Sequence, residues 1–85
     1  MDIVEDRIRD ILIEDLFLEM DKENILATHS LRDDLGLDSV GFVELRTQVE
    51  KRFSIVVSDD EFTPANFATI SSLTGLIHRR GGSVR

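Results

Sequence analysis

The groups best suited to carry chemistry gather in one short stretch of the sequence, Asp33-Asp34-Leu35-Gly36-Leu37-Asp38-Ser39-Val40. This stretch offers three carboxylates and one hydroxyl. Ser39 stands where an amphipathic pattern begins, so it falls in the first turn of a predicted helix. Such a turn exposes its side chains, and its free amides and positive dipole end favour an anion nearby. Ser39 is therefore a candidate for covalent attachment, although serine and aspartate also commonly cap helices.

Metal binding and catalysis are the other chemistries to consider for these side chains. Asp33, Asp34 and Asp38 lack the alternating acids, the central glycine and the closing glutamate of an EF-hand calcium loop. The chain has no cysteine, which excludes a thiolate metal site and a disulfide framework. His29 and His78 lie outside the stretch, so no Ser/His/Asp trio is evident. We therefore predict no metal site, no catalytic residue and no enzyme activity.

The first element that positions this stretch is an amphipathic helix at about residues 3–18, with Asp2 as its N-cap. Residues 19–37 then show no sustained helical period. A connection of roughly 20 residues exceeds the usual loop length, and in compact domains such loops often carry function. The helix pattern rests on Val4, Ile8, Ile11, Leu12 and Leu16, and the loop anchors are Ile25, Leu26, Leu31, Leu35 and Leu37.

A second helix is predicted from Asp38 or Ser39 to about Phe53. Residues 55–57 are β-branched, but a lone strand is not viable, so we expect an extended linker that buries Val57. The apolar contacts of the helix are assigned to Val43, Leu45, Val49 and Phe53.

The remaining segment should hold one short helix and one longer helix. The short helix is expected to begin at residues 59–61, with Pro64 in its first turn and Phe62 and Phe67 pointing inward. Thr69 is expected to cap the last helix, which Gly81 and Gly82 end. Its apolar side comprises Ile70, Leu73, Leu76 and Ile77.

Together these segments predict an all-α fold, a small bundle of three main helices plus one short helix, with a long loop between the first and second helices. The 85 residues suffice for one small domain, which we assign to residues 1–80, with a disordered tail at residues 81–85. A domain of this size buries only roughly 60–65% of its unfolded surface, which leaves little room for a deep catalytic pocket. A carrier or binding module is therefore favoured.

The charge and hydropathy of the chain narrow its partners and its location. Its 17 acids and 10 bases give a net charge of −7, which disfavours nucleic acid and favours proteins with basic patches. No apolar run approaches the roughly 20 residues of a membrane span, and the acidic start lacks the positive region of a signal peptide. We predict a cytoplasmic protein that binds neither nucleic acid nor membrane.

The stretch that ends in Ser39 closely resembles the phosphopantetheine attachment site of acyl carrier proteins, where a serine follows an aspartate at the head of the second helix. The resemblance extends over nearly the whole chain, through Phe53, the acids at 59–61, and Phe67-Ala68-Thr69-Ile70 with Leu73. It implies a discrete, monomeric acyl carrier domain. In such a domain Ser39 would bear 4'-phosphopantetheine from coenzyme A and hold acyl groups as thioesters. The implied partners are a phosphopantetheinyl transferase and acyl-loading, ketosynthase or acyltransferase-type enzymes.

The same resemblance implies a docking face on the second helix and the loop before it. An apolar patch with an acidic rim would fit a partner that has an apolar cleft and a basic rim. The alternative is that the valines are half-buried and the acids are only solvated. The residues assigned to this face are Asp38, Val40, Val43, Glu44, Asp59, Asp60 and Glu61.

Departures from the family pattern bear on the pathway. Arg46, Lys51 and Arg52 make the second helix less acidic than is usual in carriers of fatty-acid synthesis, and Phe42 is bulky beside the attachment site. We therefore predict polyketide-like or other specialised acyl biosynthesis.

Two alternatives stay open. Asp38 before the serine favours acyl over aminoacyl cargo, but a peptidyl carrier loaded by a separate adenylating enzyme is a rival. An unmodified helical interaction module, in which Ser39 only caps the helix, is another.

Overall fold

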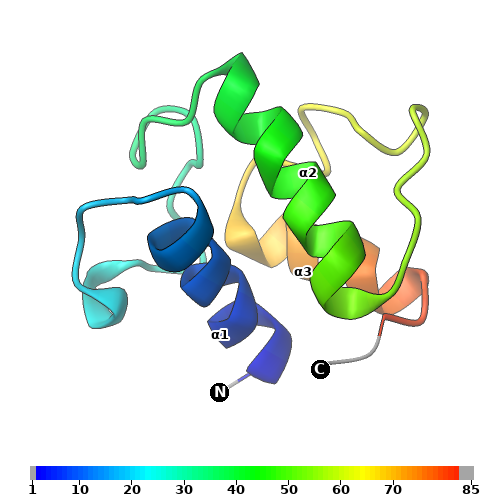
Figure 1. Cartoon of the computed structure of the whole chain (residues 1–85), viewed down its shortest axis with the longest axis horizontal. Helices are drawn as coiled ribbons and strands as arrows, with labels where there is room; N and C mark the ends of the chain where they lie inside the picture. The colour runs from blue at the N-terminus through cyan, green and yellow to red at the C-terminus, as the bar shows by residue number, and fades with distance from the viewer. Residues whose placement is uncertain (1, 83–85) are drawn as a thin grey trace.

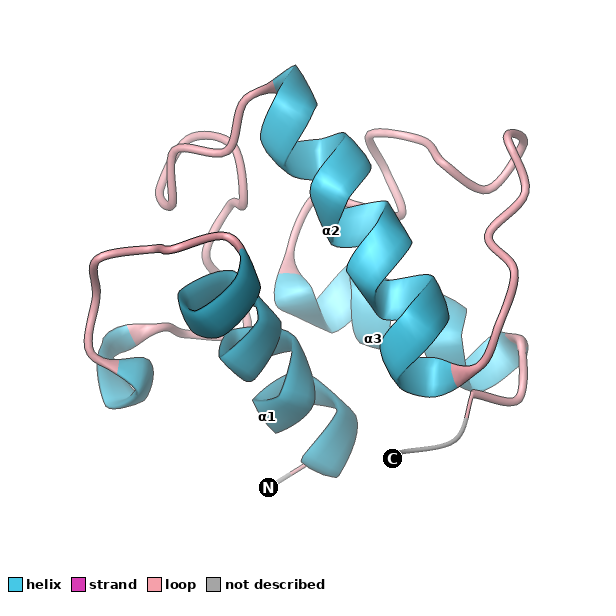
Figure 2. Cartoon of the chain, in the orientation of Figure 1, coloured by secondary structure: helices cyan, strands magenta, loops and turns pink. Residues whose placement is uncertain are grey.

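The computed structural model describes residues 2–82 and consists of helices joined by long connections (Figure 1). Within this range the only β pairing is a single bridge between Ser30 and Thr69, and no strand is drawn (Figure 2). The all-α prediction with three main helices and a long first connection is confirmed. The elements are α1 (Ile3–Asp10), the π-helix η1 (Ile11–Asp15), the 3-10 helix η2 (Lys22–Asn24), α2 (Ser39–Phe53) and α3 (Ile70–Arg79).

The core lies where the three helices meet. In Figure 1, α2 crosses the molecule diagonally with α3 behind it, and α1 lies to one side. Leu45, Val49 and Phe53 are fully buried, as their spacing on α2 predicted. Both connections also contribute to this core, through Ile25, Leu31, Leu35, Leu37, Val57 and Phe67.

The first helix begins as predicted and ends earlier than predicted. The Asp2 carboxylate accepts a hydrogen bond from the Val4 amide at 2.8 Å, which caps α1. The helix was expected to reach residue 18, but it widens into η1 and ends at Asp15. There the Leu18 amide bonds back to the Leu12 carbonyl at 2.9 Å, and Phe17 takes a left-handed conformation with φ of 59°. Glycine usually occupies such a position, so the sequence carried no signal for this end.

The connection between η1 and α2, residues 16–38, is held by most of its predicted anchors. Ile25, Leu31 and Leu35 are buried, whereas Leu26, expected to be an anchor, is 53% exposed. The reason is a local turn in which the Leu26 amide donates to Nδ1 of His29 at 3.0 Å. The turn fixes the backbone there, and the Leu26 side chain faces solvent.

The connection between α2 and α3, residues 54–69, contains turns where a short helix was expected. Val57 is fully buried, as predicted. From there the Phe62 amide bonds to the Ser58 carbonyl and the Phe67 amide to the Thr63 carbonyl, each at 3.0 Å, as two separate turns. Pro64 lies between the two turns and has no N–H to donate, so it interrupts the helical hydrogen-bond pattern there.

The last helix is capped at both ends within the described residues. The hydroxyls of Thr69 and Ser72 bond reciprocally to each other's backbone amides, at 3.0 and 3.1 Å. The Gly82 amide bonds to the Ile77 carbonyl at 2.9 Å, so Gly81 and Gly82 of the predicted tail belong to the folded end of α3. Residues 83–85, the rest of that tail, lie outside the described residues. Across residues 2–82 no helix has the length and apolarity to span a bilayer.

Candidate functional site

Ser39 is the first residue of α2, and its neighbour Asp38 takes the role of cap. The Asp38 carboxylate accepts a hydrogen bond from the Gly41 amide at 2.8 Å. A Cβ at Gly41 would lie 3.4 Å from that carboxylate and 3.3 Å from Leu37 Cγ, so glycine permits this close approach. Ser39 itself is exposed, and the hydrogen bonds found within residues 2–82 include none from its hydroxyl. The hydroxyl is therefore accessible to an incoming group.

The acids before Ser39 act as turn-forming residues. Asp34 accepts a hydrogen bond from the Ser30 amide at 2.7 Å, and the Ser30 hydroxyl accepts one from the Asp33 amide at 2.9 Å. Gly36 has φ of 75°, a left-handed value that brings the chain round to Asp38. The part of the chain that is described holds no cluster of side chains suited to a metal ion.

Ser39 borders a groove of about 590 Å³ that the sequence did not reveal. Three segments form its walls: residues 28–34, the first turn and a half of α2, and residues 62–69. A β bridge between Ser30 and Thr69 and a 2.9 Å hydrogen bond from the Leu31 amide to the Ala68 carbonyl join two of these walls. The apolar lining consists of Phe42, Val43, Phe62, Pro64, Phe67 and Ala68.

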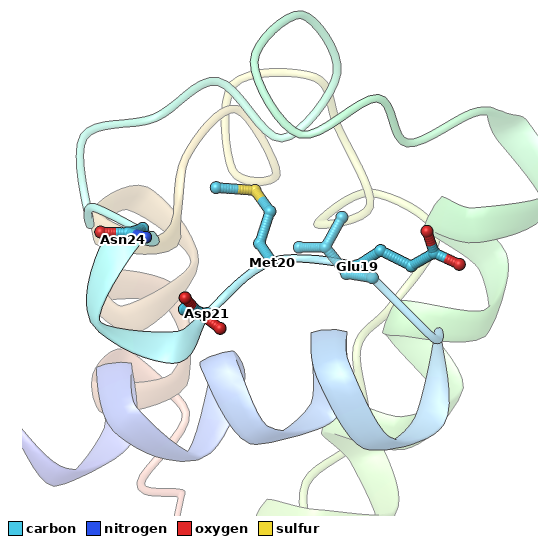
Figure 3. Close-up of a pocket in the computed structure, with 5 residues that line it drawn as sticks. Glu19, Met20, Asp21 and Asn24 are labelled. Atoms are coloured by element: carbon cyan, nitrogen blue, oxygen red, sulfur yellow. The ribbon is translucent and has the colours of Figure 1, made fainter.

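A second hollow lies beside the loop that follows η1 (Figure 3). Its lining residues are Leu18, Glu19, Met20, Asp21 and Asn24, and none of them also lines the groove at Ser39. This hollow offers carboxylates, an amide and a thioether but no hydroxyl for covalent attachment. The groove at Ser39 is therefore the candidate site.

The residues assigned to docking on α2 differ in their exposure. Val40 and Val43 are 74% and 55% exposed, although Val43 had also been assigned to the packing side of the helix. Asp38 is exposed beside them. Glu44 is half-buried and accepts a hydrogen bond from the Gln48 side chain at 3.1 Å.

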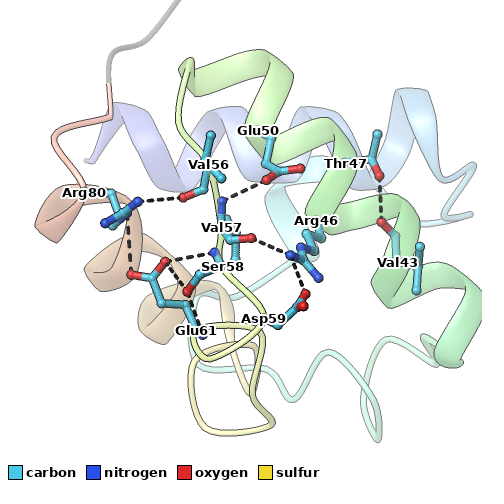
Figure 4. A network of polar contacts seen from close by, with 10 residues as sticks. All are labelled: Val43, Arg46, Thr47, Glu50, Val56, Val57, Ser58, Asp59, Glu61 and Arg80. Atoms are coloured by element: carbon cyan, nitrogen blue, oxygen red, sulfur yellow. Dashed lines mark hydrogen bonds and ion pairs between the residues drawn. The ribbon is translucent and has the colours of Figure 1, made fainter.

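Two of the three acids at 59–61 have partners inside the molecule (Figure 4). Asp59 accepts a hydrogen bond from Arg46 at 3.0 Å, and Glu61 pairs with Arg80 at 3.5 Å. The Ser58 amide also bonds to Glu61 at 3.0 Å, and this bond is the main cause that lowers the pKa of Glu61 below its ordinary value. These carboxylates therefore tie the second connection in place as well as adding negative charge to the surface.

Sequence reasoning missed Arg46 as a structural residue. Its guanidinium also donates to the carbonyl of Val57 and lies 4.9 Å from the centre of the Phe62 ring. These partners stand 11 to 16 positions away along the chain. Helical periodicity does not report contacts at such separations.

Comparison with known proteins gives this arrangement a family. A family model described as a phosphopantetheine attachment site matches residues 6–77. The acyl carrier protein of Phytoplasma australiense is 36% identical over 62 residues, which cover 73% of this chain and 79% of that protein. The chain belongs to the acyl carrier protein family.

Further relatives agree with the membership. An acyl carrier protein of Buchnera aphidicola is 40% identical over 63 residues, which cover 74% of this chain and 76% of its own length. A holo acyl carrier protein of Nitrosomonas europaea, solved by NMR, superposes with a TM-score of 0.78 at 30% identity, over 88% of this chain and 92% of that chain. An aminoacyl carrier protein of Bradyrhizobium diazoefficiens is 38% identical over 50 residues. That match covers 59% of this chain and 56% of the relative's length.

Membership of the family defines the role and the prosthetic group. The protein is an acyl carrier, not a catalyst, and its prosthetic group is phosphopantetheine, whose thiol holds an acyl group as a thioester. The chain fits such a group, since an exposed serine hydroxyl stands at the edge of an apolar groove. Its partners are a phosphopantetheinyl transferase and enzymes that handle acyl groups.

Proposed function

We propose that Ser39 is the residue that bears the phosphopantetheine arm. The observation that carries this proposal is the division of roles at the start of α2, where Asp38 caps the helix and leaves the Ser39 hydroxyl exposed at the groove. The helix N-terminus adds a favourable environment for the phosphodiester, because its free amides and dipole stabilise negative charge. Ser39 needs no activating base of its own, since the transferase supplies one.

Intact mass after incubation with coenzyme A and a broad-specificity phosphopantetheinyl transferase tests this assignment. The wild type should gain one phosphopantetheine group, and Ser39→Ala should gain none while it keeps its circular dichroism spectrum. Ser71→Ala is the matched control, because Ser71 is an exposed serine in the first turn of α3. Modification of the Ser39→Ala protein, or of no variant with several competent transferases, would refute the proposal.

The arm is proposed to work with a docking face on α2 and the loops beside it. Exposed valines flanked by acids support this surface, and they suit a partner with an apolar cleft and a basic rim. Within it, Val40 and Val43 are the apolar centre. The acidic residues are Asp38, Glu44, Asp59, Asp60 and Glu61.

The pathway is proposed to be polyketide-like or other specialised acyl biosynthesis, with ketosynthase or acyltransferase-type partners. Support comes from the second half of α2, where Lys51 is exposed and Arg52 is half-exposed beside Asp15. Basic rims of fatty-acid enzymes would meet positive charge there. Turnover of the malonyl-loaded carrier by reconstituted fatty-acid synthesis enzymes should therefore be poor, and Lys51→Glu should raise it. Efficient turnover of the wild type would contradict the specialised role.

An aminoacyl cargo is the second candidate, favoured by the 38% identity to an aminoacyl carrier protein. It predicts that the holo carrier gains the mass of an amino acid when it is incubated with ATP and an adenylating enzyme. The acyl proposal predicts that the arm stays free in that mixture and is loaded by acyltransferases. The predictions of a monomer in the cytoplasm that binds neither nucleic acid nor membrane stay predictions.

A further inference from the structure

The groove at Ser39 follows α2 for little more than one turn. Its lining on that helix ends with Phe42 and Val43. Arg46 comes next on the same side of α2, because residues three and four positions apart on a helix are neighbours. A chain that lay in the groove and ran along α2 would therefore meet Arg46.

Arg46 contacts the second connection at three points: Val57 and Asp59, drawn in Figure 4, and Phe62, which lines the groove. Its guanidinium donates to the buried Val57 carbonyl and to the Asp59 carboxylate, and it stacks over the ring of Phe62. A planar guanidinium is suited to combine hydrogen bonds with aromatic stacking in this way.

The Phe62 ring connects Arg46 to the lining of the groove. It meets the ring of Phe67 edge-on, with 5.0 Å between centroids and 84° between planes, and Phe67 is only 2% exposed. Both rings line the groove. Glu50, one turn beyond Arg46, holds the second connection just before this wall of the groove through a 2.8 Å hydrogen bond from the Val57 amide. Parting α2 from residues 57–62 would break the contacts of Arg46 and Glu50 together.

We infer that Arg46 is a specificity-determining residue that closes the inner end of the groove and keeps long acyl chains out of the core. The inference rests on the proposed attachment at Ser39. It assigns to this carrier a cargo of short or polar acyl groups that stay at the surface. A long apolar chain would have to displace Arg46 and Phe62 to pass from the groove into the core.

The test compares acyl-chain effects within each variant. Wild type, Arg46→Met and Arg52→Met would be loaded with acetyl and octanoyl groups from the corresponding coenzyme A thioesters. Arg52 is the matched control, because it lies on the same helix and pairs with Asp15 on η1. Its side chain is 28% exposed, against 23% for Arg46. Melting temperature and the amide shifts of Phe62 and Phe67 are the readouts.

We expect acetyl and octanoyl forms to melt together in the wild type and in Arg52→Met. In Arg46→Met the octanoyl form should melt roughly 4 °C or more above the acetyl form. Such a shift is typical of a modest gain in the free energy of unfolding of a small domain. Phe62 and Phe67 amide shifts should then differ between the two acyl forms. General destabilisation alone would lower the melting temperatures of the acetyl and octanoyl forms equally. The difference between these two temperatures therefore reports the closing role of Arg46.

Octanoyl stabilisation of the wild type would overturn the inference, and so would equal melting of both forms in Arg46→Met. If Arg46→Met does not fold, Arg46→Lys serves instead, because it keeps the charge and loses the planar stacking. Failure of loading, seen as no gain of mass, would instead count against Ser39 attachment, so the two proposals fail in distinguishable ways.

Discussion

The two connections that flank α2 are both long, yet they are fixed in different ways. Residues 16–38 rest mainly on buried leucines and Ile25 and on short side-chain turns such as Ser30–Asp34. Helix α1 adds a hydrogen bond from Arg9 to the Ile25 carbonyl at 2.7 Å and two ion pairs to Lys22. Residues 54–69 bury Val57 and Phe67, but side chains of the flanking helices do much of the holding, chiefly Arg46 and Arg80.

Because the two connections are held differently, their positions should differ in sensitivity to salt and to substitution. Burial of apolar side chains is strong and insensitive to salt, so the first connection should present Ser39 in a constant position. Exposed ion pairs contribute little each and are screened by salt. The second connection, which forms one wall of the groove, is therefore the part of the site that substitution can most easily reshape.

The strongest way to break the first connection is to remove a buried anchor. Leu31 is fully buried, so Leu31→Ala should lower the free energy of unfolding by about 2–5 kcal/mol. Chemical denaturation would measure it. Leu26→Ala is the control in the same loop, and since its side chain is 53% exposed it should have a small effect. Equal losses would show that burial does not distinguish these residues.

In the second connection, loss of a side-chain hydrogen bond should cost less than loss of a buried anchor such as Leu31. Glu50→Ala removes the acceptor for the Val57 amide and leaves that buried group unpaired, which costs about 1–3 kcal/mol. Lys51→Ala, at the exposed neighbouring position, should change stability little. Urea denaturation of both variants is the measurement, and a loss above that of Leu31→Ala would reverse the proposed ranking of the connections.

A smaller effect is expected from the backbone of the first connection. Gly36→Ala meets no atom within 4 Å, so the left-handed φ of 75° alone should destabilise the protein, by about 1 kcal/mol. Gly75→Ala is a control of opposite sign. It lies within α3, where alanine stabilises a helix by up to about 1 kcal/mol. An unchanged free energy of unfolding in Gly36→Ala would mean that the loop accepts another conformation at this position.

The smallest effect should be a pH dependence in the second connection. The pKa of Glu61 is lowered in the folded state, chiefly by the Ser58 amide, so its contribution is present above the ordinary carboxyl pKa. It is lost as pH falls through the lowered value. Glu61→Gln should reduce the change of melting temperature with pH in this range. Asp60→Asn, an exposed neighbour outside the network of Figure 4, should leave it unchanged.

Much of the fold was predictable because it follows local patterns. The spacing of Leu45, Val49 and Phe53 gave the buried side of α2, and the caps Asp2 and Thr69 were recognisable from residue type. These features depend on neighbours three or four positions apart, which a sequence displays directly.

The end of η1 and the groove were not predictable for two separate reasons. Phe17 takes a left-handed conformation that its residue type disfavours, and its side chain is 80% exposed, so neither residue type nor apolar pattern marks this end of the helix. The groove unites residues 28–34 with residues 62–69, and its Arg46 closure spans 11 to 16 positions. Ser39 and its neighbours Asp38, Phe42 and Val43 could be placed together beforehand, because the helix start and the family resemblance both pointed to this turn.

Two backbone hydrogen bonds join the first connection to the second connection and to the start of α3, and they make opening of the groove measurable. The Leu31 amide bonds to the Ala68 carbonyl and the Ser71 amide to the Ala27 carbonyl, whereas the Val57 amide bonds to a side chain of α2. Hydrogen exchange at Leu31 and Ser71 would therefore report the opening of these backbone pairs, and exchange at Val57 would report the separation of the second connection from α2. Because Leu31 and Ser71 are held by backbone pairs and Val57 is held by a side chain, the amide of Val57 should exchange first. The second connection then separates from α2 while the backbone pairs of Leu31 and Ser71 stay closed.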